Sequence, residues 1–130
     1  TELAKALAEF KRVLKPGGIL IIREPAYSWL KSHHDTIFES SERFTKKELA
    51  KKLKNVGFLI REKTYINTLL FPLVLLKRLF ERKDYPVAEM FPKNSLFNFF
   101  YYILVLEAWI LKLISFPFGL SVVCVGQKKE

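Results

Sequence analysis

The fold is decided by one stretch near the start of the chain, EFKRVLKPGG at residues 9–18 followed by ILII at 19–22. Pro16 cannot continue a helix, and Gly17-Gly18 permit a tight turn behind it. Four consecutive apolar residues, bounded by glycine and by Arg23-Glu24-Pro25, are typical of a strand that is buried on both faces. The stretch therefore predicts a helix, a turn and a strand of the kind found in parallel α/β sheets.

Amphipathic helices are predicted on both sides of this strand. Residues 1–14 place apolar side chains along one stripe of a helix, at Leu3, Leu7, Phe10 and Leu14. A second helix is predicted to start after Thr45, which forms a capping box with Glu48, and to end at Gly57. A strand at 58–66 follows. The order helix, strand, helix, strand predicts the second half of a doubly wound α/β sheet.

The remainder of the chain is more apolar. We expect a helix at 67–82, a loop containing Pro86 and Pro92, a long helix at 96–114 and a last strand at 120–125. Three further side chains are expected to be packing residues of the folded domain: Trp29, Trp109 and Cys124.

Taken in order, these segments resemble the class I S-adenosylmethionine-dependent methyltransferase family. The L-K-P-G-G turn is similar to the one that leads into the family's fifth strand, and residues 43–49 and 56–58 are similar to the next helix start and the turn into the sixth strand. Residues 117–125 resemble the final, antiparallel strand. Residues 68–114 resemble a helical pair that a subgroup carries between its last two strands.

The resemblance implies the fold class and the domain organisation. Residues 1–130 would be the C-terminal half of a Rossmann-like methyltransferase sheet, with parallel strands and a final antiparallel strand. Residues 68–114 would be an apolar helical insertion that acts as a lid. One departure limits the comparison: relatives often have a His-x-Arg-Arg-aromatic run where residues 40–44 read SSERF, so only Arg43 matches it.

The resemblance also implies a cofactor, S-adenosylmethionine, and an activity, methyl transfer. The cofactor-binding half of such a fold needs a strand followed by a glycine-rich turn and an acidic residue after the next strand. The five glycines of this chain contain no G-x-G-x-G pattern. We therefore expect the cofactor to be bound by a half that precedes Thr1 in a longer parent enzyme, and the chain alone to be inactive.

Three residues are predicted to bind the methyl acceptor. Ligands of open α/β sheets lie beyond the carboxyl ends of the parallel strands, where Glu24, Tyr27 and Arg43 are expected. The apolar insertion predicts a partly hydrophobic acceptor, such as a lipid, an isoprenoid or an aromatic small molecule. The alternative is that Glu24 and Arg43 only pair with each other at the surface. No catalytic acid or base is nominated, because methyl transfer depends mainly on positioning.

The formal charge of +9, from 22 Lys and Arg against 13 Asp and Glu, leaves two non-enzymatic alternatives. One is a basic membrane-associated module anchored by 96–114. The other is a nucleic-acid-binding domain that uses the lysine-rich helix 46–54, although no RNA-binding or zinc-finger signature accompanies the charge and no nucleic-acid partner is expected.

The helix 96–114 could cover roughly 28 Å, close to the thickness of a bilayer core. Its apolar residues would favour insertion by roughly 4–7 kcal/mol and Glu107 near its centre would cost about 3 kcal/mol, so the sum does not decide. The proline-containing loop before it and the short strand after it favour a lid or core helix, with a peripheral membrane contact left open. The single cysteine favours a reduced, cytoplasmic setting. The unpaired apolar edge of 19–22 is expected to make the isolated chain self-associate. No metal site is predicted, since the adjacent His33 and His34 rarely converge on one ion.

Overall fold

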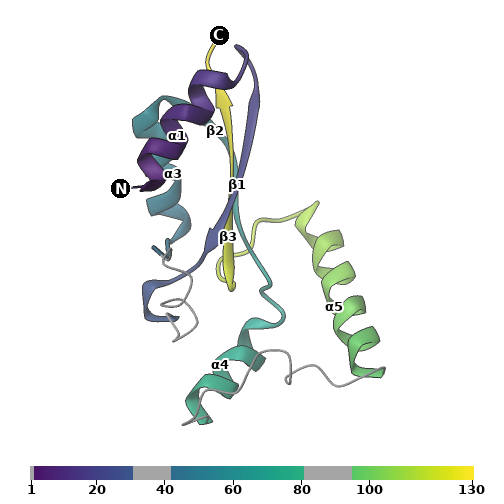
Figure 1. Ribbon diagram of the computed structural model, residues 1–130. Coiled ribbons are helices and arrows are strands. Elements are labelled where there is room, and N and C mark those ends of the chain that lie inside the picture. The colour runs from purple at the N-terminus through teal and green to yellow at the C-terminus, as the bar shows by residue number, and fades with distance from the viewer. Residues whose placement is uncertain (1, 31–41, 81–94) are drawn as a thin grey trace.

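The computed structural model describes residues 2–30, 42–80 and 95–130 (Figure 1). In chain order, its elements are α1 (Glu2–Val13), β1 (Ile19–Pro25), the 3-10 helix η1 (Ser28–Leu30), α3 (Lys46–Val56), β2 (Phe58–Ile66), α4 (Phe71–Phe80), α5 (Ser95–Leu111) and β3 (Ser121–Lys128). Figure 1 shows α1 and α3 together on one side of the sheet, while α4 lies beyond the end where β1 and β2 finish and α5 stands on the side away from α1 and α3.

The three strands form one sheet in the order β1-β3-β2. The central strand β3 runs antiparallel to both neighbours, so that Cys124 lies opposite Ile22 on one side and Lys63 on the other. Strands β1 and β2 therefore point in the same direction without pairing with each other. The α/β class is confirmed, but the described strands contain no parallel ladder, which a doubly wound sheet would require.

Only one face of the sheet is covered by α1 and α3. The largest fully buried side chains come from these helices and from the central strand, and they are Leu7, Leu49, Leu53, Val122 and Cys124. Burial of Cys124 is as predicted. On the opposite face Ile21 is 68% exposed and Ile19 is also exposed. The prediction that 19–22 is buried on both faces is wrong for the described chain, because alternate residues of β1 point away from the two helices.

Helix α3 begins and ends at the predicted residues. The Thr45 hydroxyl accepts a hydrogen bond from the Glu48 backbone N–H at 3.3 Å, and the Glu48 carboxylate accepts one from the Thr45 N–H at 2.8 Å. Gly57 adopts φ 96°, in the left-handed region, and its N–H donates to the last carbonyls of the helix. The capping box and the glycine cap are therefore confirmed, and β2 starts directly after them.

The carboxyl end of β1 is tied to two other segments. The Ala26 N–H donates to the Leu120 carbonyl at 3.0 Å, and the Phe44 N–H donates to the Pro25 carbonyl at 3.0 Å. A Cβ atom at Gly119 would collide with the carbonyl oxygen of Ile66, so glycine lets the approach to β3 pass close to the end of β2. These contacts collect the ends of β1 and β2, the start of α3 and the start of β3 in one place.

Candidate functional site

An aromatic cluster occupies the place where these segments meet. Tyr27, two residues after β1, stacks on Tyr65 of β2 with ring centroids 5.3 Å apart and an interplanar angle of 15°. The ring centroid of Trp29 lies 5.4 Å from that of Tyr27, and the ring centroid of Phe71 of α4 lies 6.1 Å from that of Tyr27. Phe71 also contacts Phe118 at 5.5 Å. These five residues are called the aromatic cluster below.

Lys46, the first residue of α3, connects the aromatic cluster to the sheet. Its backbone N–H donates to the Tyr65 hydroxyl at 3.1 Å, and its Nζ lies 5.5 Å from the centroid of the Tyr65 ring. The same Nζ donates to the Phe116 carbonyl at 3.3 Å. A cation over the ring and a hydrogen bond to the phenol hold Tyr65 in one orientation.

The predicted residue Tyr27 belongs to this cluster and has two unusual properties. Its backbone φ is 55°, a conformation rare for residues other than glycine. Burial, followed by the hydrogen bond and the charge interaction with Tyr65, raises the pKa of Tyr27 to about 12. The Tyr27 phenol is thus paired with Tyr65 and loses its proton at a higher pH than an ordinary tyrosine.

The predicted residue Glu24 lies within β1 rather than beyond its end, and it is half-buried. Burial is the main cause that raises the pKa of its carboxyl, and repulsion from Glu42 adds to it. Position 24 falls on the same face of β1 as the buried Ile22, because side chains alternate along a strand. The Glu24 side chain therefore lies on the face of β1 that the helices cover.

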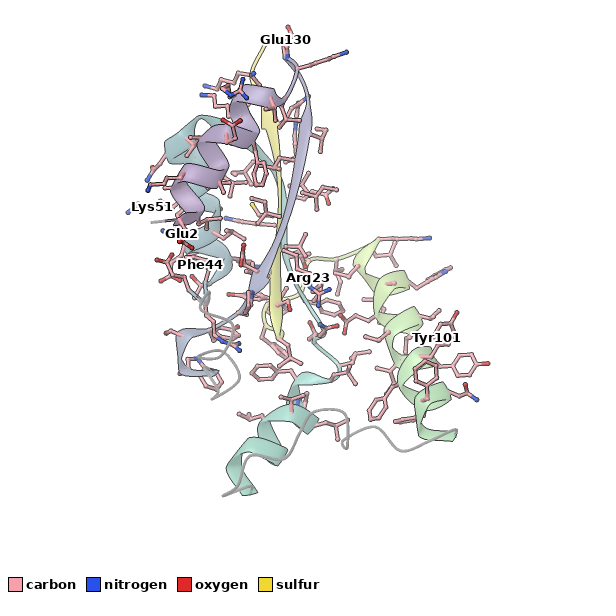
Figure 2. All side chains as sticks on the ribbon, viewed as in Figure 1. Glu2, Arg23, Phe44, Lys51, Tyr101 and Glu130 are labelled. Atoms are coloured by element: carbon pink, nitrogen blue, oxygen red, sulfur yellow. The ribbon has the colours of Figure 1, made fainter. Side chains whose placement is uncertain are left out.

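The predicted residue Arg43 lies on the segment that leads into α3. Its Nη1 donates to the Ala26 carbonyl at 3.1 Å, which links this segment to the end of β1. Figure 2 shows the neighbouring Phe44 next to α3, where it is buried. Thus Glu24, Tyr27 and Arg43 all lie at the expected end of the sheet, but only Tyr27 joins the aromatic cluster.

Sequence reasoning missed the other partners of Tyr27. Tyr65 could have been found, because it lies at the end of the predicted strand 58–66 and so at the same edge as Tyr27. The remaining members, Phe71 and Phe118, and the adjacent Lys46 depend on how α4 and the approach to β3 fold back. No local pattern in the sequence announces those contacts.

The described glycines do not fit a cofactor-binding turn. Gly17 and Gly57 precede β1 and β2, at the end of the sheet opposite to the aromatic cluster. Gly119 packs against the backbone of β2, and Gly126 lies against Leu53 and Phe58, where an added Cβ would come within 3.0 and 3.2 Å of their side chains. Each glycine thus serves the packing or turns of the chain itself.

Three further expectations concern metals, lysines and membranes. Within residues 2–30, 42–80 and 95–130 no three His, Cys, Asp or Glu side chains could jointly hold a metal ion, and the pair His33-His34 lies outside the described residues. On α3, Lys52 approaches Glu42 at 3.6 Å and Lys46 is bonded as above. None of the helices in the described parts of the chain combines the length and apolarity needed to cross a membrane.

Comparison with known proteins adds one weak similarity. No protein-family model and no curated protein matches the chain. A solved structure of phosphoethanolamine N-methyltransferase 2 from Haemonchus contortus, in complex with S-adenosyl-L-methionine, is similar with a TM-score of 0.47 and 14% sequence identity. The match covers 100% of this chain and 30% of that protein. A similarity of this size assigns neither a family nor an activity.

Proposed function

We propose that this chain is the C-terminal part of a class I S-adenosylmethionine-dependent methyltransferase domain. In this proposal a longer parent protein transfers a methyl group to a partly hydrophobic small-molecule or lipid acceptor. The observation that carries the proposal is the L-K-P-G-G turn, which leads from α1 into β1 at the start of a sheet whose last strand is antiparallel.

The order of the elements supports the proposal. Strands β1 and β2 run in the same direction, each follows a helix, and β3 returns antiparallel between them. Helices α4 and α5 fall between β2 and β3 in the chain, where the resemblance expects an inserted helical pair. The free edge of β1 is then the edge to which the preceding half of the sheet would add its strands.

The aromatic cluster is the acceptor side of the proposed site. Its rings offer an apolar wall, and the oxygen of the Tyr27 hydroxyl can accept a hydrogen bond from a polar group of the acceptor. Phe71 brings α4 against this wall, so the helical pair can act as a lid that excludes water. The contribution of these residues is to hold the acceptor atom in line, which accounts for much of the rate of a two-substrate transfer.

S-adenosylmethionine supplies the methyl group in this proposal, and the described residues do not hold it. The glycines are engaged elsewhere in the fold, so residues outside this chain would bind the cofactor. Calorimetry checks this directly. We expect no saturable binding of S-adenosylmethionine by the 130-residue chain and micromolar binding by the parent. Saturable binding by the chain alone would contradict the division into two halves.

The acceptor site is tested in the parent protein with S-adenosylmethionine carrying a labelled methyl group and a total lipid extract as acceptor. We expect label to enter the organic phase with the wild type. Tyr27→Ala or Tyr65→Ala should reduce it at least about tenfold through lost positioning. Phe10→Ala is the control, because Phe10 is an exposed aromatic residue on α1, outside the aromatic cluster.

Thermal melting of each variant separates a site from a structural role. Glu24→Gln and Arg43→Lys are measured in the same assay, since both residues were predicted to bind acceptor. Lost transfer at an unchanged melting temperature supports the site. Full transfer in both tyrosine variants would remove the aromatic cluster from it, and no labelled product with any lipid or soluble acceptor would overturn the proposed activity.

A further inference from the structure

Helix α5 turns its acidic residue inward and its apolar residues outward. Glu107 is only 3% exposed, and its carboxylate accepts hydrogen bonds from the backbone N–H groups of Asn67 and Leu69, the latter at 3.0 Å. Ile110 and Leu111 pack partly against the core. The stripe that contacts the rest of the chain therefore contains the only carboxylate of α5.

The opposite side of α5 is formed by residues spaced three or four apart or adjacent: Asn98, Tyr101, Tyr102, Val105 and Trp109. Together with Lys112, the residue that directly follows the helix, they are called the outer face. All six are exposed, with Tyr102 at 69% and Trp109 at 65%. Figure 2 shows Tyr101 on the side of α5 that is turned away from the sheet. The expectation that Trp109 is a packing residue is therefore wrong within the described structure.

The composition of the outer face matches the interface between a membrane and water. Tyrosine and tryptophan are enriched at the headgroup level of bilayers, because their rings are apolar at one end and polar at the other. Lys112 adds a positive charge and the inward Glu107 leaves the face without a negative one. The whole chain carries +9, which favours a negatively charged surface.

A protein partner fits this face less well. Binding sites for proteins have an apolar centre surrounded by a polar rim. Here the exposed positions between 97 and 114 are all apolar or aromatic except Asn98 and Lys112, so the apolar surface has no such rim. A fluid acyl-chain boundary can cover a face of this kind along its full length.

We propose that the outer face of α5 lies flat in the surface of an anionic lipid bilayer and anchors the protein there peripherally. The helix cannot release its inner side, because Glu107 is bonded to the turn between β2 and α4. Only the outer face is then available to lipid, which orients α5 parallel to the membrane surface. This inference does not depend on methyl transfer, since it rests on the orientation and composition of α5 alone.

The two tryptophans of the chain allow a direct test. Trp29→Phe leaves Trp109 as the only tryptophan, and Trp109→Phe leaves Trp29, which is similarly exposed at 61% but lies outside α5. Both variants are mixed with vesicles of phosphatidylcholine and phosphatidylglycerol that carry brominated acyl chains. We expect strong fluorescence quenching of Trp109 and little quenching of Trp29. Both changes keep an aromatic ring, so the test does not depend on a disruptive substitution.

Affinity is measured by vesicle sedimentation. Tyr102→Ser combined with Trp109→Ser should weaken binding at least about tenfold, whereas Phe10→Ser, at an exposed position of α1, should change it little. Salt at about 0.5 M should weaken wild-type binding, because it screens charges beyond a few ångströms. Absence of binding, quenching of Trp29 instead of Trp109, or equal binding to pure phosphatidylcholine would overturn the proposal. Shielding of Trp109 from iodide without vesicles, together with concentration-dependent particle size, would assign the face to a second copy of the chain and also overturn it.

Discussion

The sheet with α1 and α3 and the outlying helix α5 are built on opposite principles. Around the sheet, apolar side chains such as Leu7, Leu53 and Val122 are fully buried and most charges are outside. On α5 the buried residue is Glu107, and the aromatic residues Tyr102 and Trp109 are exposed. The sheet region is held by removing apolar surface from water, whereas α5 is held by hydrogen bonds to the Glu107 carboxylate and by partial packing of Ile110 and Leu111 against the core.

This difference shows that hydrophobic residues have two uses in one chain. In the sheet region they stabilise the fold, and their truncation should lower the free energy of unfolding. On the outer face of α5 they remain in contact with solvent, so their truncation should leave the fold intact and change only what the face binds.

The largest expected effect is on the free energy of unfolding, and it is tested by truncating one buried and one exposed leucine. Leu53→Ala should lower the free energy of unfolding by about 2–5 kcal/mol, because Leu53 is fully buried between α3 and the sheet. Leu106→Ala should change it by less than about 0.5 kcal/mol, because Leu106 is 55% exposed. Urea denaturation followed by circular dichroism measures both. Equal losses would show that α5 is packed as tightly as α3.

The next effect concerns the attachment of α5. Glu107→Ala should lower the free energy of unfolding by about 2–3 kcal/mol, since the Asn67 and Leu69 N–H groups would lose a charged acceptor in a part-buried place. Glu107→Gln should cost less, because its carbonyl oxygen can still accept one hydrogen bond. Hydrogen exchange of the two amides is the specific readout, and Lys112→Ala is the control. Unchanged protection in Glu107→Ala would mean that another contact holds α5.

The contrast also explains what sequence reasoning could and could not predict. Turn and cap signals are local, so the residues around Pro16, Thr45 and Gly57 predicted the ends of α1 and α3 and the starts of β1 and β2. The periodic stripe of residues 1–14 was right for Leu7 but not for Phe10, which is exposed. The neighbours that decide such cases come from distant parts of the chain.

The site and α5 depend on those distant contacts. The edge rule placed Tyr27 correctly, because it uses only strand direction. The inward orientation of Glu107 depends on the N–H groups near Asn67, forty residues away, which the sequence around the long helix does not show. The exposure of Trp109 could not be read from a run of apolar residues, since such a run does not show which side is covered.

A smaller effect tests the junction between the two regions, where Tyr27 contacts Phe71 of α4. The pKa of Tyr27, about 12, exceeds the ordinary tyrosine value of 10.0. Between these two pH values the folded state therefore binds more protons than the unfolded state. The free energy of unfolding should therefore fall as pH rises from 10 to 12, by about 1 kcal/mol after allowance for partial exposure. Absorbance titration at high pH should show one late tyrosine that Tyr27→Phe abolishes. Titration of every tyrosine near pH 10 would contradict the pairing with Tyr65.

The smallest expected effect on stability concerns Glu24, because its carboxyl is half-buried in the sheet region. Burial and the nearby Glu42 raise its pKa, so its charged form is disfavoured in the folded state. The stability that Glu24 contributes is greatest below the ordinary carboxyl pKa of 4.5 and is lost as pH rises through the raised value. Glu24→Gln should accordingly stabilise the protein at pH 7 by less than about 1 kcal/mol and have no such effect below about pH 4.

Glu62→Gln, at an exposed position of β2, is the control and should change the melting temperature little at either pH. A loss of stability in Glu24→Gln at pH 7 would show that favourable contacts stabilise the Glu24 carboxylate, as they stabilise that of Glu107. The sheet region and α5 would then not differ in this respect.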